Sequence, residues 1–188
     1  LLPESQLIEM SKQQYTAFLA EATVLPDSDP RAQKVKEVGE KIKVATEKFL
    51  TEKGYGKRIE GFEWEFKTVE EDVVNAWCMP GGKVCVYTGI LPLFATDDEM
   101  AVVMGHEIAH AIARHGNERM SQQMVINGVG SVLSPADTTQ VSIYQQVFIG
   151  SATLGMLKYS RNHETESDKL GLVFAKLAGY DPSAAITF

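Results

Sequence analysis

The sequence predicts an α+β fold that is mostly helical and contains a small β-sheet. Long segments near both ends repeat apolar residues every three or four positions, which is the period of an amphipathic helix. Between them, the stretch GFEWEFKTV alternates apolar and polar residues, as a half-buried strand does. Two further apolar runs, VVNAW and KVCVYTG, flank the turn Pro80-Gly81-Gly82. These observations place short strands between N-terminal and C-terminal helices.

The length and composition of the chain suit one globular domain. We expect its 188 residues to form a single domain, with N-terminal helices over residues 1–56 and the strands and later helices over residues 57–188. The net charge of −7 argues against a nucleic-acid partner. The longest apolar stretch, residues 141–157, is interrupted by two glutamines and two glycines, so we expect no transmembrane segment. Because the first residue is not methionine, we expect a processed start, as left by removal of a signal peptide.

The first two predicted helices are separated by the stretch PDSDP, residues 26–30. The first helix covers residues 5–25. In the second, Asp29 is placed to cap the N-terminus, and Pro30 takes the first helical position, where a missing N–H costs no hydrogen bond. The second helix should end at the glycines of residues 54–56.

Three strands are expected next, and two of them carry the cysteines of the chain. The first strand is defined by the alternating aromatic residues Phe62, Trp64 and Phe66. Cys78 and Cys85 flank the Pro80-Gly81-Gly82 turn, where a disulfide is one option. We favour two buried thiols, because free cysteine is among the most buried residue types.

The stretch TDDEMAVVMGHEIAHAIARHG carries the signals of a complete helix. Thr96 followed by Glu99 is a capping box, acidic residues occupy the first turn, and Gly116 is suited to end the helix. Residues 117–158 have helical tendency. A last helix is expected over residues 160–178.

The pattern HExxH within this helix indicates a metal centre. His106 and His110 are four residues apart, so both imidazoles project from one face and can reach one tetrahedral zinc ion. Glu107 lies beside the first ligand, where a general base can take a proton from water. His115 should face away, about half a turn from His106, as a surface cation near the helix end. The pattern with a third histidine needs His at position 116, where Gly116 stands.

The third ligand must therefore come from another segment, and SRNHETESDKLG is the best candidate. Glu164 and Asp168 share a helix face, so Glu164 can complete a His-His-Glu set. Asp168, one turn later, can accept the free N–H of a ligand imidazole. Glu166 should point to solvent, and His163 is the second choice as a ligand. Small residues on the same face, Gly171 and Ala175, would let this helix approach its partner closely.

Four stretches in order, VVNAWCMPGGKVCVYTGIL, DDEMAVVMGHEIAHAIARH, SRNHETESDKLGL and AGYDPSAA, resemble the HtpX/BepA/Oma1-type zinc metallopeptidases, relatives of the CAAX prenyl proteases. The resemblance covers about residues 70–188. It implies a gluzincin-like metallopeptidase domain with a small β-sheet beside the active-site helix. It also implies one Zn²⁺ held by His106, His110 and Glu164, with Glu107 as catalytic base and Asp168 in support.

The same resemblance implies further properties of substrate and location. Asn75, Ala76 and Trp77 match the family's strand beside the cleft, where a polypeptide substrate would bind by strand addition. The membrane spans of HtpX and the prenyl proteases are missing, so we expect the soluble periplasmic or envelope-associated branch, as a lipoprotein with its signal removed and with membrane-associated partners. Members of that branch continue past the last residue of this chain, so we expect a C-terminal truncation. Tyr159 and Tyr180 are candidates for stabilising the oxyanion, although packing roles are favoured for both.

Two other functions remain open from the residues. A deformylase-like hydrolase also uses HExxH but takes a cysteine as third ligand, and Cys78 or Cys85 could serve. A non-catalytic chaperone or assembly factor could retain a zinc site, and a latent protease with a plugged cleft would behave in the same way. Intact Glu107 favours the metalloendopeptidase, acting on unfolded or misassembled proteins in envelope quality control.

Overall fold

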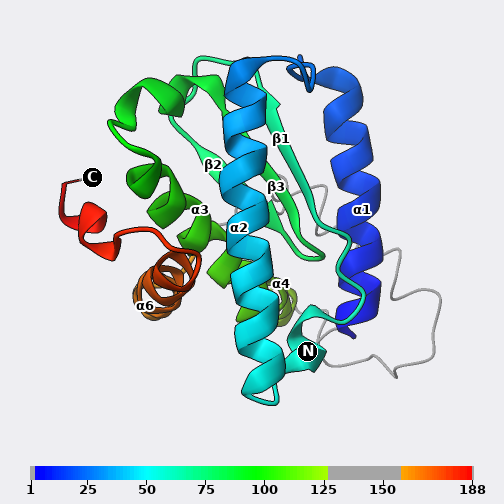
Figure 1. Cartoon of the computed structure of the whole chain (residues 1–188). Helices are drawn as coiled ribbons and strands as arrows, with labels where there is room; N and C mark the ends of the chain where they lie inside the picture. Colours follow the sequence, from blue (N-terminus) through cyan, green and yellow to red (C-terminus); the bar gives the residue numbers. More distant parts are fainter. Residues whose placement is uncertain (1–2, 127–157, 188) are drawn as a thin grey trace.

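The computed structural model describes residues 3–126 and 158–187. As the sequence predicts, its strands lie between N-terminal and C-terminal helices along the chain (Figure 1). The long helices are α1 (Glu4–Glu21), α2 (Pro30–Glu52), α3 (Asp97–Ile112), α4 (His115–Ile126) and α6 (Arg161–Leu177). The strands are β1 (Glu65–Val69), β2 (Ala76–Met79) and β3 (Lys83–Tyr87), and short 3₁₀ helices cover Gly56–Ile59, Thr88–Leu93 and Pro182–Ile186. The α+β, mostly helical fold class is therefore confirmed. Most of the predicted helical region 117–158, including the apolar stretch 141–157, lies outside the described residues.

The three strands form one sheet in the order β1-β3-β2. β3 pairs in parallel with β1 and antiparallel with β2 across the predicted glycine turn. Gly81 and Gly82 have φ angles of 94° and 86°, which residues with a side chain rarely adopt, so the turn depends on glycine. β2 therefore stands at one edge of the sheet, with β3 on its inner side.

The first strand begins later than predicted. Trp64 and Phe62 precede β1, which starts at Glu65. The backbone N–H groups of Glu63 and Glu65 donate to the carbonyls of Gly81 and Gly82, at 3.0 Å each. Because this segment bonds to the turn rather than to a straight strand, it does not form a regular ladder.

The sheet separates two apolar clusters (Figure 1). α1 covers one face, with Leu7 and Tyr15 packed beside Trp77. α2 and α3 cover the other face, α6 packs against these two helices, and their cluster includes Cys78. Cys85 belongs to the α1 side, so the two cysteines lie on opposite faces of the sheet, and both are free and buried. The prediction of two buried thiols is confirmed.

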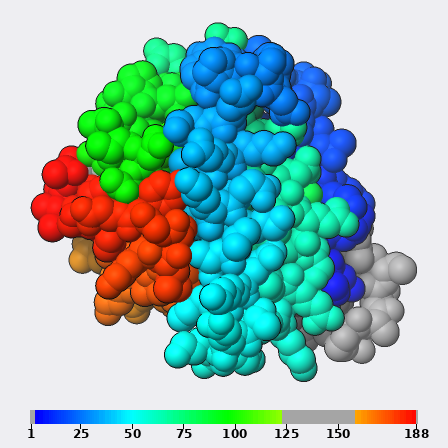
Figure 2. All heavy atoms as spheres, in the orientation of Figure 1, coloured from blue at the N-terminus to red at the C-terminus, as the bar shows by residue number. Residues whose placement is uncertain are grey.

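α3 and α6 approach each other closely at two glycines. A Cβ atom on Gly171 would lie 2.6 Å from the backbone nitrogen of His106, and one on Gly105 would lie 2.7 Å from the carbonyl oxygen of Gly171. Neither helix can therefore carry a side chain here without moving the other. Figure 2 shows the C-terminal residues lying against α2 as well, so α6 is held from two sides.

Side-chain caps fix where the helices of the site begin. Thr96 Oγ1 accepts from the backbone N–H of Glu99 at 3.3 Å, and Ser160 Oγ accepts from that of His163 at 3.2 Å. Asp29 caps α2 as predicted, through the N–H of Arg31 at 2.8 Å. These bonds set the rotation of α3 and α6, and hence the faces that carry the functional side chains.

The end of α3 differs from the prediction. The helix stops at Ile112, and Arg114 has a φ of 62°, the left-handed conformation that non-glycine residues seldom adopt. Arg114 donates to the carbonyl of Lys57 at 3.2 Å, and Arg58 donates to that of Ala113 at 3.5 Å, so the turn is fastened to the 3₁₀ helix after α2. A new helix, α4, then begins at His115.

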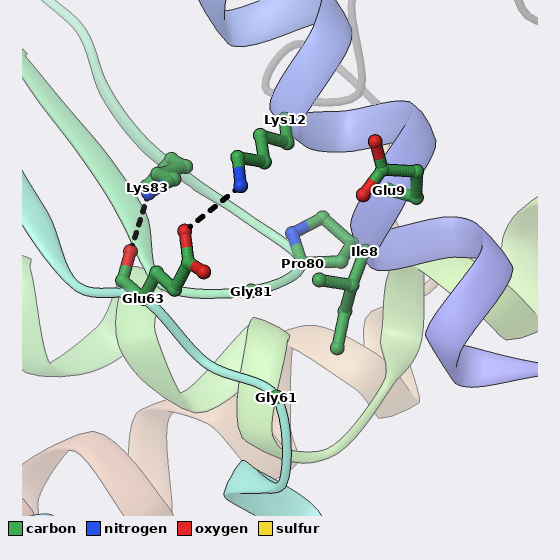
Figure 3. A pocket seen from close by; sticks show the side chains of 8 residues that line it. All are labelled: Ile8, Glu9, Lys12, Gly61, Glu63, Pro80, Gly81 and Lys83. Atoms are coloured by element: carbon green, nitrogen blue, oxygen red, sulfur yellow. Dashed lines mark hydrogen bonds and ion pairs between the residues drawn. The ribbon is translucent and has the colours of Figure 1, made fainter.

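A small pocket of about 80 Å³ lies between α1 and the glycine turn (Figure 3). Lys12 and Lys83 both point to Glu63, through an ion pair of 3.1 Å to the carboxylate and a hydrogen bond of 2.5 Å to the backbone carbonyl. Because the lysines are engaged within the protein, we assign the pocket a structural role in fastening α1 to the sheet. Nowhere in the described chain is a helix both long and apolar enough to cross a bilayer.

Candidate metal centre

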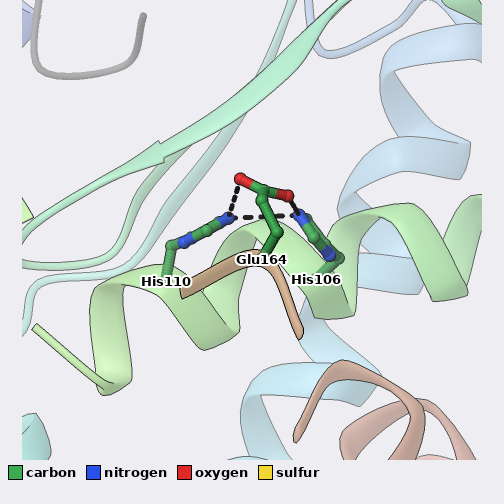
Figure 4. A group of neighbouring side chains, drawn as sticks. All are labelled: His106, His110 and Glu164. Carbon is green, nitrogen blue, oxygen red and sulfur yellow. Dashed lines mark hydrogen bonds and ion pairs between the residues drawn. The ribbon is translucent and has the colours of Figure 1, made fainter. Parts of the chain in front are cut away.

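Three predicted side chains from two helices meet at one point (Figure 4). His106 and His110 project from α3 toward the carboxylate of Glu164 on α6. The two Nε2 atoms lie 3.1 Å apart. Glu164 places Oε2 3.1 Å from Nε2 of His106 and Oε1 3.3 Å from Nε2 of His110. The structure thus brings together the three residues that the sequence selected as ligands.

The hydrogen bond at the far side of His106 fixes where the proton of that imidazole lies. Nδ1 of His106 lies 2.8 Å from Oδ1 of Asp168, an acceptor, so Nδ1 carries the hydrogen and Nε2 carries the lone pair. Nδ1 of His110 lies 2.9 Å from Nδ1 of His115. Burial, followed by the charges of the neighbouring histidines, lowers the pKa of His110 to about 3, so the ring is neutral at pH 7. Asp168 therefore lies where the predicted support of His106 requires it.

The donor set fits a small cation. When His110, like His106, carries its hydrogen on Nδ1, two Nε2 lone pairs and a carboxylate face one another, and these acceptors repel unless a positive charge lies among them. Zinc–nitrogen bonds of about 2.05 Å at tetrahedral angles would separate ligand atoms by about 3.3 Å. The spacings of 3.1, 3.1 and 3.3 Å are within about 0.2 Å of this value. The residues present are therefore suited to zinc.

The centre is buried at one end and open at the other. The side chain of His110 is 2% exposed, whereas those of His106 and Glu164 are 20% and 44% exposed. The ring of Tyr159 stacks on His110, with centroids 4.0 Å apart, and covers it. Solvent and a substrate can therefore reach the centre from the side of His106 and Glu164.

Glu107 lies next to this group of acceptors, on the side of the sheet. Burial, and then the negative charge of Glu164, raise the pKa of Glu107 to about 8. Burial raises the pKa of the Cys78 thiol of β2 and of the Tyr159 phenol, and the negative charge of ionised Glu107 raises both further. A carboxyl group in that position can exchange a proton with a molecule held at the centre.

The two cysteines are not placed as ligands. Burial raises the pKa of both thiols, and thiolates rather than thiols bind zinc. Cys85 also faces the α1 side of the sheet. Among the described residues, the one cluster suited to a metal contains Glu164 and neither cysteine. The structure therefore favours the carboxylate over a deformylase-like cysteine as third ligand.

The interpretation of His115 as a surface cation is wrong. Its side chain is 1% exposed, because the left-handed turn at Arg114 ends α3 and directs His115 back toward His110. His163, the second choice as a ligand, stacks on His115 with centroids 4.3 Å apart and bonds to Glu118 at 3.0 Å, away from the ligand group. Glu166 was expected to point freely into solvent. Its side chain is 56% exposed but reaches Nε2 of His115 at 3.2 Å.

The predicted substrate strand lies at the edge of the sheet. The carbonyl of Asn75 accepts from Tyr87 at 3.1 Å, so by antiparallel alternation Ala76 directs its backbone N–H and C=O outward, and Trp77 directs them toward β3. The Trp77 side chain is buried on the α1 side and donates to the hydroxyl of Tyr87 at 3.1 Å. Of the three residues, Ala76 directs its backbone toward the open edge, and its N–H donates to Oδ1 of Asn75 at 2.9 Å. Tyr180 lies beside Lys41 of α2, which suits packing rather than catalysis.

Comparison with known proteins identifies relatives of this arrangement. The family model described as "Peptidase family M48" matches residues 32–188 of this chain. The mitochondrial metalloendopeptidase OMA1 of Arabidopsis thaliana is 40% identical over 129 residues, which is 69% of this chain and 26% of that protein. The Saccharomyces cerevisiae protein of the same name is 32% identical, over 87% of this chain and 46% of its own. The β-barrel assembly-enhancing protease of Escherichia coli is 26% identical, over 66% of this chain and 27% of its own. The chain thus spans less than half the length of these relatives.

Proposed function

Because the chain belongs to peptidase family M48, we propose that it is a zinc-dependent metalloendopeptidase, in which His106, His110 and Glu164 bind one zinc ion. The observation that carries the proposal is the meeting of two imidazoles from α3 and a carboxylate from α6, whose ligand atoms lie within 4.8 Å of one another. Relatives named as metalloendopeptidases support the same activity. We also propose that residues 1–188 act as a single catalytic domain.

The division of roles follows from the position of each side chain. Zinc in such a centre supplies positive charge that polarises a peptide carbonyl and makes a water molecule more acidic. The positive charge of a bound zinc ion would favour the ionised form of Glu107, which would then accept a proton from the attacking water and donate it to the nitrogen of the leaving amine. Asp168 holds His106 by accepting from Nδ1, at 2.8 Å. The peptide is aligned as an extra strand along β2, where Ala76 has outward-facing backbone groups.

The substrate class and the compartment are also part of the proposal. Strand addition requires an extended backbone, so we propose unfolded or misassembled polypeptides as substrates. The names of the relatives point to two settings, mitochondria and β-barrel assembly. We propose the second, with protein quality control in a bacterial envelope, on the resemblance to the soluble branch of the family. Detection of the protein in fractionated cells distinguishes an envelope from a mitochondrial location.

Replacing Glu164 by alanine tests the ligand set. We expect the variant to lose stoichiometric zinc and casein cleavage together, because two imidazoles alone leave the site one protein ligand short. Zinc is counted by metal analysis after dialysis, and folding is followed by circular dichroism. Glu52→Ala, which removes an exposed carboxylate 3.9 Å from Lys48, is the control and should keep both properties. Retention of one zinc per chain in Glu164→Ala would instead support a cysteine ligand.

Replacing Asp168 by alanine tests the support of His106. Without the acceptor at Nδ1, the ring loses its fixed orientation, and we expect zinc affinity to fall about 10–100-fold. Competition with a coloured chelator measures the dissociation constant. Asp168→Asn keeps an oxygen that can accept from Nδ1 and should retain most of the affinity. Equal affinity in the alanine variant and the wild type would remove Asp168 from the site.

A further inference from the structure

The contacts of His115 extend the hydrogen bonding of the metal centre to a second carboxylate. We propose that His115 and Glu166 together hold His110 in the tautomer whose Nε2 lone pair faces the centre. Both are positioning residues, and the inference rests on the proposed function of His110 as a ligand. The sequence suggested neither role, since His115 was expected at the surface and Glu166 in solvent.

The first step is the contact between Glu166 and His115. Oε2 of Glu166 lies 3.2 Å from Nε2 of His115. An ionised carboxylate can only accept a hydrogen bond, so Nε2 of His115 must carry the hydrogen. In a neutral imidazole the other nitrogen then has only a lone pair. Glu166 therefore makes Nδ1 of His115 an acceptor.

The second step is the contact between His115 and His110. Nδ1 of His115 and Nδ1 of His110 lie 2.9 Å apart, at hydrogen-bond distance. Because Nδ1 of His115 accepts, Nδ1 of His110 must donate, which leaves Nε2 of His110 without hydrogen. The Ser167 hydroxyl also lies 3.3 Å from Nδ1 of His115, but a hydroxyl both donates and accepts, so it does not select a tautomer. The contact with Glu166 therefore selects the tautomer of His115.

The two ligand histidines thus reach the same protonation state by different routes. His106 meets its carboxylate directly, at 2.8 Å from Asp168 on α6. His110 is 2% exposed and reaches Glu166 through one intervening imidazole. The opposite tautomer of His110 would place a hydrogen on Nε2, where a metal must bind.

Ring contacts hold the intervening imidazole in place. His115 is stacked against His163, with an interplanar angle of 17°, and is buried at the start of α4. Its backbone position follows from the left-handed Arg114. Because the stacked His163 ring and the backbone after Arg114 hold the His115 imidazole in place, the fold sets the direction of its hydrogen bonds. These bonds run to Glu166 and His110.

The tautomer of His110 can be measured in the zinc-free protein by ¹H–¹⁵N NMR of the histidine side chains. Wild type should show hydrogen on Nδ1. His115→Leu removes the acceptor, so His110 should populate the Nε2–H form, and zinc affinity should fall about 10–100-fold. His115→Asn keeps a polar atom near the position of Nδ1 and should restore most of the affinity and the Nδ1–H form. An unchanged tautomer and zinc dissociation constant in His115→Leu would overturn the proposal, as would equal losses in the two variants.

Glu166 provides the test that does not disturb the buried core. Glu166→Ala should mix the tautomers of His110 and weaken zinc binding, whereas Glu166→Gln, whose amide oxygen still accepts, should do so less. Glu118→Ala is the matched control, because this carboxylate bonds to His163 at 3.0 Å and not to His115. It should leave His110 unchanged. If Glu166→Ala and Glu118→Ala behave alike, the proposal is wrong. The NMR result does not depend on peptide cleavage, so it stands apart from a failure of the proposed activity.

Discussion

Replacing Glu107 by glutamine should reduce casein cleavage by at least about 10²–10⁴-fold while one zinc ion stays bound per chain. Glutamine has almost the same shape as glutamate but cannot accept a proton from water. It also leaves His106, His110 and Glu164 in place, so the metal ligands are intact. This is the largest effect on activity that we expect from a single substitution that leaves the metal bound.

The measurement combines metal analysis with a fluorescent casein assay on both proteins. Glu47→Gln is the control for the same chemical change at a partly buried glutamate outside the ligand group, since this residue accepts from Trp64 at 2.9 Å. It should cleave at the wild-type rate. Wild-type cleavage by Glu107→Gln would show that Glu107 is not the base, whereas inactivity of every variant including wild type would indicate a latent or non-catalytic protein.

Replacing Gly171 by alanine should destabilise the protein and weaken the metal centre together. The new methyl group would lie 2.6 Å from the backbone nitrogen of His106 and 2.9 Å from the carbonyl carbon of Gly105, so α6 must move away from α3. Overpacking of this kind costs about 1–3 kcal/mol. The gain in helix propensity from glycine to alanine, about 1 kcal/mol, offsets only part of it.

The free energy of unfolding, from urea denaturation of the zinc-free protein, measures the packing cost, and chelator competition measures the metal affinity. Gly56→Ala is the matched control, because a Cβ atom there meets nothing within 4 Å. It should unfold as the wild type does. A Gly171→Ala protein with unchanged stability and zinc affinity would show that the two helices can separate without cost.

The meeting of His106, His110 and Glu164 could be predicted because helical spacing restricts the positions of these side chains so strongly. His106 with His110, and Glu164 with Asp168, are pairs four residues apart, and each helix carries its own capping residue, Thr96 or Ser160. Once both segments are helices, each pair must share a face. Small residues at the contact, Gly105 and Gly171, then let the two faces meet.

There is a physical reason why the sequence did not predict the buried position of His115. The expectation assumed that α3 continued to Gly116, since glycine is the usual residue at a helix end. The chain turns two residues earlier, at Arg114, whose left-handed conformation is held by tertiary contacts with Lys57 and not by a local preference. No periodicity within residues 97–116 contains that information. The contact of Glu166 with His115 was missed for the same reason, because His115 was expected at the surface, facing away from the ligand group.

The start of the first strand was also decided by distant contacts. Alternation predicted a strand from Phe62, but the backbone at Glu63 and Glu65 bonds to the glycine turn about 20 residues later. Alternating aromatic residues show which side is buried. They do not show which part of the backbone finds a regular partner.

The separation of the ligands along the chain has a consequence for biosynthesis. α3 carries two of the proposed ligands and the base, whereas α6 carries Glu164 and Asp168. A nascent polypeptide that has emerged only as far as α4 has half of the centre and no Glu164. With the proposed ligands, a complete metal centre can therefore form only after α6 has been synthesised and packed against α3.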